Sequence, residues 1–431
     1  MNRLDRKFCF GLALFASAFP AFAQTHTRGA KMTVDTADQA CVQLHDNNKW
    51  TSSITDLDGV GTNYTLSTFV ANGHLTLAAP TISSSDHPHA TGYGNGFKWD
   101  STDETTGSWS PQGFTIGSVN GDEMGFASWN WSGASPSHGT RLSIVDVADL
   151  SNVVYRDIQM VLPTGPGTYE AIAEHAGGIA AFTGGRYLYV TEGSGFHVFD
   201  LNNIRKVNTT ACTASDGTPI FGKNSAGDYC AGGYEFMVPQ VAEYSVPSTT
   251  ESGTAISATC NPKFSWGGYD WRRATNYLLS GEYCGAAADG SACNGDSSFL
   301  NGRMYMWPVA STGELAVDTA GYVSPFRVYY MNESDVQGIA SDNNLDSDGV
   351  SYPTDTYYLA STYENGFIYR VGENVATESW SYDAGTAPYH PEGMYATSTP
   401  NMWVLTEGGG GSSDPAGEGR SVFYLHQGDI R

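Results

Sequence analysis

Short apolar runs alternate along the chain with clusters of small polar residues. The runs are rich in Val, Ile, Tyr, Phe and Trp, and the intervening clusters are rich in Gly, Ser, Asn, Asp and Thr. Helical periodicity is almost absent. This pattern is typical of an all-β protein whose strands are separated by turns.

The predicted strands fall into sets of about four. Four complete sets lie within residues 112–163, 175–246, 263–331 and 336–383, and residues 390–427 hold a fifth set with three strands. Such sets predict the blades of a β-propeller. We expect an N-terminal strand to complete the fifth blade, with residues 63–79 as the natural candidate, because closing the ring removes exposed sheet edges.

The predicted fold class is therefore an all-β propeller with five blades, closed by an N-terminal strand. Six or seven blades are the alternative if residues 40–100 form a blade of their own. Residues 24–110 are expected to be an N-terminal segment with the ring-closing strand, and residues 111–431 to carry the blades. No Pro-rich or Gly/Ser-rich linker divides the chain, so these parts are expected to form a single domain.

The N-terminus has the features of a secretory signal peptide. Arg3, Arg6 and Lys7 precede the short apolar stretch 8–19, and Ala21-Phe22-Ala23 fits a cleavage site, so the predicted signal peptide covers residues 1–23. No later segment is long and apolar enough to span a membrane. We expect a secreted, extracellular or periplasmic monomer with no membrane partner.

The charge of the chain excludes one class of partner. The formal net charge is −24, and the predicted signal peptide holds several of the few basic residues. Nucleic acid is therefore not expected as a ligand. An even number of cysteines remains beyond the signal peptide, which predicts disulfides in an exported protein. The expected pairs are Cys212–Cys230 and Cys284–Cys293 as local loops, with Cys41–Cys260 by elimination.

Two segments of the chain align without a gap. The 21 residues from His175 share seven identities with those from His390, including the histidine itself and a closing Thr-Glu-Gly that contains Glu192 or Glu407. In a propeller, first strands begin and second strands end on the same face, near the central channel. The repeat therefore predicts that both histidines and both glutamates approach one channel mouth.

The same rule places residues of other blades at this mouth. They are Gln112, Asn130, Trp131, Glu282, Tyr283, Gln337, Thr362 and Tyr363, and Arg141, Arg303 and Arg420 stand where third strands begin. Concave sites with convergent titratable groups are functional candidates. The alternative is that the repeated polar residues only tie neighbouring blades together.

Three chemistries fit these residue types. β-Elimination on a uronic-acid glycan needs a base, an acid for the leaving oxygen, and a group that neutralises the sugar carboxylate. His175 or His390, Tyr283, and Arg303 or Arg420 fill these roles. The other predicted mouth residues, Gln112, Trp131, Arg141, Glu192, Glu282, Gln337, Tyr363 and Glu407, would bind the substrate. Glycoside hydrolysis would instead use paired glutamates, and a divalent metal at the mouth is the third possibility.

The stretch that begins at His175 and the "HPEG…LTE" segment resemble secreted bacterial propeller proteins over residues 110–430. More loosely, they are similar to propeller-fold polysaccharide lyases of the ulvan and rhamnose–glucuronate type. The resemblance implies an extracellular polysaccharide as partner and a polysaccharide lyase as the favoured activity. The alternatives are a non-catalytic propeller that binds glycan or protein, and a glycoside hydrolase.

A separate signal lies in residues 344–355. Asn344, Asp346, Asp348 and Asp355 stand at positions one, three, five and twelve of the segment, with glycine at six. This is the spacing of a calcium loop, so the sequence predicts a structural calcium ion there, with an Asx-rich turn as the alternative.

Overall fold

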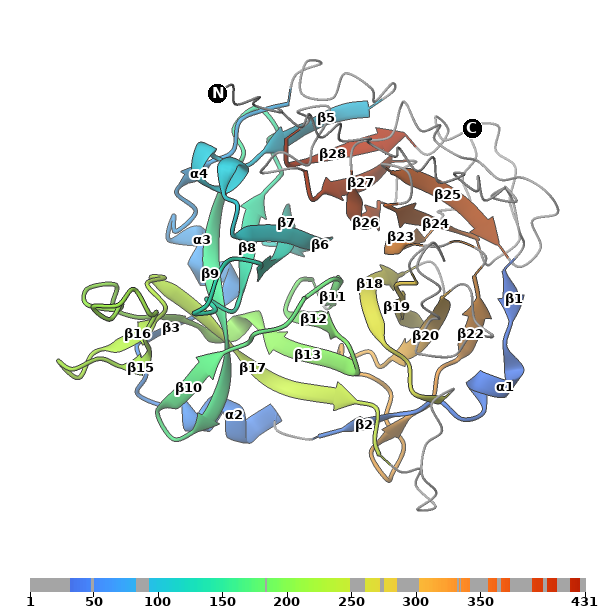
Figure 1. Cartoon of the computed structure of the whole chain (residues 1–431), viewed down its shortest axis with the longest axis horizontal. Helices are drawn as coiled ribbons and strands as arrows, with labels where there is room; N and C mark the ends of the chain where they lie inside the picture. The colour runs from blue at the N-terminus through green and yellow to red at the C-terminus, as the bar shows by residue number, and fades with distance from the viewer. Residues whose placement is uncertain are drawn as a thin grey trace, which may run out of the picture.

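The computed structural model describes residues 32–47, 50–82, 93–182, 184–248, 260–271, 275–284, 302–331, 333, 335–341, 356–362, 366–372, 390–397, 401–408 and 419–426. The predicted signal peptide, the predicted calcium loop and Tyr363 lie outside these residues. The described chain consists mainly of antiparallel strands that radiate around a common centre (Figure 1). This arrangement confirms the all-β class and the propeller architecture.

From the centre outward, the strands are joined into units of three or four. They are β6 (Trp109–Val119), β7 (Asp122–Trp131), β8 (Thr140–Asp146) and β9 (Val154–Gly165); β11 (Ile179–Phe182), β12 (Tyr187–Glu192), β13 (Gly195–Asp200) and β17 (Phe236–Ser245); β18 (Phe264–Asp270), β19 (Asn276–Glu282), β20 (Arg303–Val309) and β22 (Arg327–Tyr330); β23 (Val336–Ser341), β24 (Thr356–Ser361) and β25 (Phe367–Gly372); and β26 (Pro391–Ala396), β27 (Asn401–Thr406), β28 (Ser421–His426) and β5 (Tyr93–Lys98). Apart from β5, these strands match the predicted sets.

The innermost strands follow one another around the centre. β6 contacts β11, β11 contacts β18, β18 contacts β23, β23 contacts β26, and β26 contacts β6 again. Their backbones approach closely: a Cβ atom on Gly178 would lie 1.7 Å from the nitrogen of Gly267, and one on Gly393 would lie 2.0 Å from the nitrogen of Phe114. Only glycine fits at such positions. The ends of the first strands are thereby held around one axis.

The hydrophobic core lies in layers between neighbouring units. One layer packs Ile368 of β25 and Tyr358 of β24 against Met394 and Met402 of the next unit. Another packs Trp403 of β27 against the unit that begins with β6. Four tryptophans are almost fully buried: Trp99, Trp129, Trp266 and Trp307. Face-to-face packing on large side chains explains the high aromatic content of the strands.

The N-terminal segment supplies the last strand of the final unit, although not from the residues predicted. β5 pairs with β28, with Phe97 opposite Val422. Residues 63–79 were predicted for this place, and this detail is wrong: they contribute to β3 (Thr62–Tyr64), α3 (Leu66–Ala71) and β4 (Leu77–Ala78), on the outside of the ring. The hydroxyl of Thr65 caps α3, so the apolar residues after it form a helix that buries Leu66 and Phe69.

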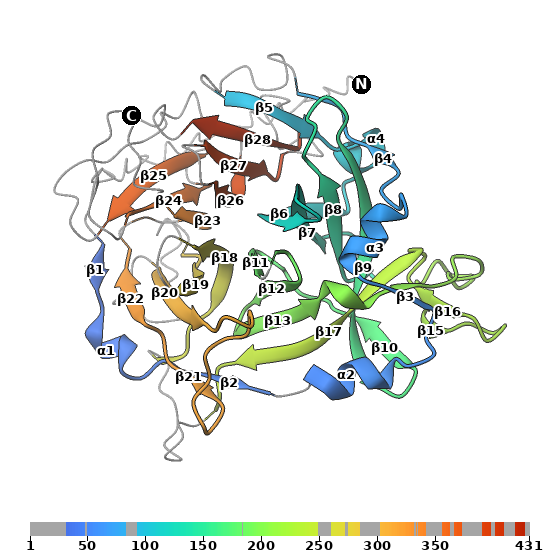
Figure 2. The same ribbon diagram turned by 180° about the vertical axis from the view of Figure 1, so that it is seen from behind.

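Other short elements complete the outer surface. β1 (Thr33–Val34) extends the sheet of β22, and β2 (Leu44–Asp46) pairs with β17 and β21 (Tyr322–Val323). The remaining elements are α1 (Thr36–Gln39), α2 (Trp50–Asp56), α4 (Ser101–Thr105), the 3-10 turn Leu201–Asn203, β10 (Thr168–Ala171), β14 (Ile204–Lys206), β15 (Phe221–Lys223) and β16 (Tyr229–Ala231). Figure 2 shows β15 and β16 projecting from the side of the ring. In the described part of the chain, no helix is both long and apolar enough to cross a membrane.

Disulfides fix the N-terminal segment and the projecting hairpin. Cys41 is bonded to Cys260 and Cys212 is bonded to Cys230, which confirms two predicted pairs. Cys284 is also disulfide-bonded. Its predicted partner, Cys293, lies outside the described residues.

Candidate functional site

Polar side chains from several units meet at one end of the central axis. They lie at the starts of first strands and at the ends of second strands, as the repeat predicts. The members are Gln112 and Asn130 from the unit of β6, His175 from the segment before β11, Tyr283 after β19, Asp335, Gln337 and Thr362 from the unit of β23, and His390, Glu392 and Glu407 from the unit of β26. We call this set the channel-mouth cluster.

His175 links two units of the ring. Its Nδ1 lies 3.2 Å from Nδ2 of Asn130. The side chain reaches solvent, yet protein surrounds much of it, and this burial lowers the pKa of His175 although Glu407 acts in the opposite direction. With the side-chain amide of Asn130 rotated by 180°, its oxygen would accept a hydrogen bond from Nδ1–H of His175. Nε2 of His175 would then be the basic nitrogen.

Glu407 is the centre of the contacts near the last unit. Its Oε2 lies 3.7 Å from Nδ1 of His390, and its Oε1 accepts a hydrogen bond from Nε2 of Gln112 at 3.4 Å. Burial alone would raise the pKa of Glu407, but His390, Ser110 and Arg420 together lower it. Glu407 therefore acts on both histidines of the sequence repeat: it lies beside His390 and raises the pKa of His175 by its charge.

Glu392 is a buried acid that the sequence did not single out. Its side chain is 1% exposed, and neither carboxyl oxygen has a hydrogen-bond partner among the described residues. Burial raises the pKa of Glu392 well above its usual value, and the charge of Glu407 adds to the effect. Buried oxygens of Gln112, Asn130 and Gln337 also lack described partners. Such a group of unsatisfied acceptors is expected where water or a ligand donates hydrogen bonds.

The raised pKa of Glu392 predicts a specific pH dependence of stability. The folded protein holds a proton that the unfolded chain releases above pH 4.5, so the stabilising effect of protonation is full at lower pH and is lost as pH rises. Over this range the free energy of unfolding should fall by about 1.4 kcal/mol per pH unit from this group. Glu392→Gln should remove that contribution, which urea unfolding at pH 4 to 7 would measure. Equal slopes in both proteins would contradict a protonated Glu392.

Tyr283 is the exposed hydroxyl at the mouth. Its side chain is 44% exposed, and its hydroxyl is hydrogen-bonded to Asp335 and Thr362. Partial burial and the neighbouring Asp335 raise the pKa of Tyr283 to about 12, and the carboxyl of Glu392 contributes to this shift. The phenol is therefore protonated near neutral pH and can donate a proton or a hydrogen bond.

The three predicted arginines lie buried in networks of the fold. Nη2 of Arg303 donates to Oε1 of Glu282 at 2.7 Å, and Nη1 contacts Asp38. These contacts join β19, β20 and α1. Glu282, which the sequence placed among the substrate-binding residues, is therefore the buried partner of Arg303.

The other two arginines are held by α4. Nη2 of Arg141 donates to Oδ1 of Asp103 at 2.6 Å, and Nη1 of Arg420 donates to the backbone oxygen of Asp103 at 2.8 Å. Nε of Arg420 donates to the backbone oxygen of Glu407 at 3.0 Å. Arg420 therefore positions Glu407, a member of the channel-mouth cluster. The arginine itself is only 3% exposed.

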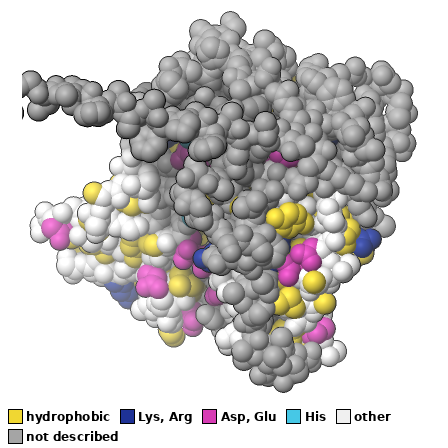
Figure 3. All heavy atoms as spheres, turned by 45° about the vertical axis from the view of Figure 1, so that its right-hand side comes forward, with side chains coloured by type: hydrophobic (Ala, Val, Ile, Leu, Met, Phe, Trp, Pro, Cys, Tyr) yellow, Lys and Arg dark blue, Asp and Glu magenta, His cyan; other side chains and the backbone are white. Residues whose placement is uncertain are grey.

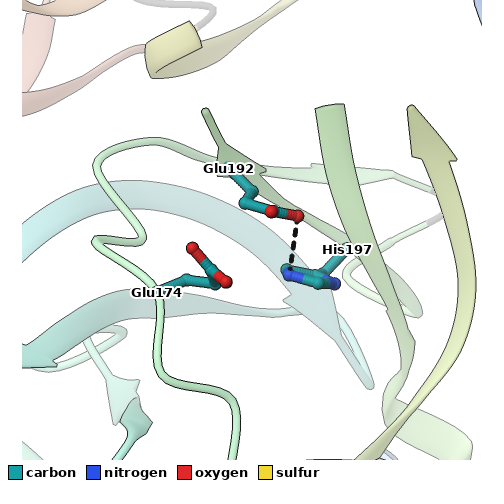
Figure 4. Close-up of side chains that lie close together, drawn as sticks. All are labelled: Glu174, Glu192 and His197. Carbon is teal, nitrogen blue, oxygen red and sulfur yellow. Dashed lines mark ion pairs between the residues drawn. The ribbon is translucent and has the colours of Figure 1, made fainter. Parts of the chain in front are cut away.

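Two further predicted residues stand apart from the cluster. Trp131 is half-buried, packs on His138 with 4.1 Å between ring centroids, and donates from Nε1 to the backbone oxygen of Ala134. Glu192 approaches His197 and Glu174 in a separate group shown in Figure 4.

On the side of the molecule in Figure 3, acidic side chains are scattered over the described surface.

Comparisons with known proteins give no family for this chain. No protein-family model and no curated protein matches it. The solved structures it resembles include the PQQ-bound form of an aldose sugar dehydrogenase from Streptomyces coelicolor (12% identity, TM-score 0.35, 75% of this chain and 96% of that chain). They also include a levansucrase variant from B. megaterium (10%, 0.33, 88% and 93%) and the apo form of the aldose sugar dehydrogenase from Escherichia coli (11%, 0.33, 82% and 97%). The strand pairing of this chain itself defines its fold.

Proposed function

We propose that the protein is a secreted five-bladed propeller whose channel-mouth cluster catalyses acid–base chemistry on an extracellular polysaccharide. The reaction supported best is β-elimination at a uronic acid. The observation that carries this proposal is a chain of neighbouring groups that leads from an exposed imidazole to an exposed phenol. Glu407 acts on His175 and on Glu392, and Glu392 acts on Tyr283. An imidazole and a phenol are the base and acid types that elimination requires.

In this mechanism, His175 removes the proton from the carbon next to the sugar carboxylate. The electron pair forms a carbon–carbon double bond as the bond to the leaving glycosidic oxygen breaks, and Tyr283 gives its proton to that oxygen. Burial disfavours the ionised form of Glu392, which reduces the repulsion of an anionic sugar near Tyr283. In this proposal the amide of the half-buried Gln337 binds the substrate carboxylate in place of the buried arginines.

Glycoside hydrolysis is the second candidate, because one observation favours it. The pKa of Glu392 is raised and the pKa of Glu407 is lowered, although both belong to the same unit. Two carboxyl groups whose pKa values are driven apart suit the general acid and the ionised partner of a hydrolase. The glutamate pairs predicted from the sequence also included Glu192 and Glu282. In the structure, Glu192 contacts His197 and Glu282 contacts Arg303.

Product analysis separates these candidates. The purified protein is mixed with a panel of uronic-acid and neutral polysaccharides, and ultraviolet absorbance and new reducing ends are followed together. β-Elimination predicts both signals on a uronic-acid glycan. Reducing ends without absorbance would support the hydrolase. If neither signal appears on any glycan, acid–base catalysis is contradicted and a binding propeller is favoured.

Two proposals concern residues outside the described part of the chain. The segment 344–355 is proposed to bind a structural calcium ion, and residues 1–23 to direct export. Adding a chelator to the same assays tests whether calcium supports the fold.

A further inference from the structure

Glu174, Glu192 and His197 form a second group of titratable side chains. Glu174 comes from the segment that leads into β11, Glu192 ends β12, and His197 lies within β13. One ligand-type atom from each lies within 4.8 Å of the others (Figure 4). The proposed acid–base chemistry uses none of these side chains.

The strand register explains why two of them converge. His197 lies opposite Val190 in the pairing of β13 with β12. Glu192 is two residues beyond Val190, so its side chain points to the same face of the sheet as His197. On the other side of β13, Glu243 of β17 lies opposite His197, and its Oε1 accepts a hydrogen bond from Nδ2 of Asn47 at 3.1 Å.

The imidazole of His197 points to a missing ligand. The residue is 7% exposed, and neither ring nitrogen has a hydrogen bond of acceptable geometry among the described residues. Nε2 lies 2.9 Å from Oε2 of Glu192, an ion pair when the imidazole is protonated, whereas Nδ1 has no partner among the described residues (Figure 4). A buried polar group in this condition requires an explanation. A ligand shared by both side chains would provide one.

The charge at this place also calls for a cation. Three carboxylates surround one imidazole: Glu174, Glu192 and the more distant Glu243. Partly buried carboxylates of like charge are costly unless a cation or a proton offsets them.

From this geometry we infer that Glu174, Glu192 and His197 bind a divalent transition-metal ion. One imidazole and two carboxylates match the protein ligands of zinc and of similar ions, with at least one coordination position left open. Calcium and magnesium prefer oxygen ligands throughout, so they should bind more weakly here.

The site would join two units of the ring. The backbone oxygen of Glu174 accepts a hydrogen bond from Oγ1 of Thr140 in β8 at 3.1 Å, whereas Glu192 and His197 belong to the next unit. An ion would therefore fix the segment between the units, which also carries His175. This inference does not depend on the proposed reaction, because it concerns binding and stability.

Metal titration of the chelator-treated full-length chain tests the inference. We expect one Zn²⁺ or Co²⁺ ion per chain at this site, a rise in melting temperature, and a visible Co²⁺ absorption band that reports its ligands. Glu192→Gln and His197→Ala should each weaken binding by at least about tenfold. Glu192→Gln keeps the shape of the side chain, so it remains informative if the histidine variant folds poorly.

Two histidine controls locate the ion. His45→Ala changes a half-buried histidine on the outer strand β2, and His390→Ala changes the channel-mouth cluster. Both should bind Zn²⁺ as the unchanged protein does. Failure to bind Zn²⁺ or Co²⁺, or binding that Glu192→Gln and His197→Ala leave intact, would overturn the inference. A loss of elimination activity without a loss of metal binding would concern the proposed function alone.

Discussion

Replacing His175 with alanine is expected to lower the rate of uronate elimination by about 10²–10⁴-fold, the usual contribution of a positioned base. The loss should appear in kcat, because the imidazole acts on the proton that moves in the transition state. Initial rates of ultraviolet absorbance on the best uronic-acid glycan measure this effect. His45→Ala, on the outer strand β2, should retain full activity.

The same assay can contradict the choice of base. His390 lies 3.7 Å from Glu407 and also carries an imidazole that can act as a base. If His175→Ala stays active while His390→Ala loses its activity, the base role belongs to His390. If both variants keep full activity, the channel-mouth histidines only tie units of the ring together.

Arg303→Ala is expected to destabilise the protein by about 3–5 kcal/mol, the typical effect of breaking a buried ion pair. Arg303 and Glu282 are each 2% exposed, and Asp38 is 6% exposed. Without the guanidinium, both buried carboxylates would lose their neutralising cation, and the link between α1 and the sheet of β20 would be lost. Urea unfolding followed by tryptophan fluorescence measures the change.

Arg186→Ala is the matched control for this prediction. Its guanidinium also pairs with a carboxylate, Asp200, at 3.0 Å, but its side chain is 45% exposed. Solvent screening limits such a pair, so its removal should cost no more than about 1 kcal/mol. If Arg303→Ala folds with unchanged stability and instead weakens uronate binding, then Arg303 is the carboxylate clamp that the sequence suggested.

The sequence predicted the repeated sheets because most strands are short apolar runs with turn residues between them. It failed at β5, whose sequence YGNGFK holds two glycines and few apolar residues. This strand forms because its backbone pairs with the outer edge of β28. It also failed at α3 and α4. Their capping residues, Thr65 and Asp100, are visible in the sequence, but these helices are too short to show a period.

The site was predictable to the extent that strand ends determine it. The repeat predicted that both histidines and both glutamates approach one mouth. His390 and Glu407 do lie 3.7 Å apart, because first strands begin where second strands end, whereas Glu192 pairs with His197. The partners of the arginines were not predictable, since Asp38 and Asp103 lie in short helices far away in sequence. Glu392 and His197 were missed because each lies within an apolar strand, where a single polar residue has no distinguishing pattern.

The central claim is that side chains from different units of the ring form one acid–base site. The most direct test is a double-mutant cycle between His175 and Tyr283, with elimination rates for the unchanged protein, His175→Ala, Tyr283→Phe and the double variant. A shared site predicts that the double variant is about as slow as the slower single variant, because the two groups act in the same step. Losses that multiply, or a Tyr283→Phe variant with full activity, would contradict it.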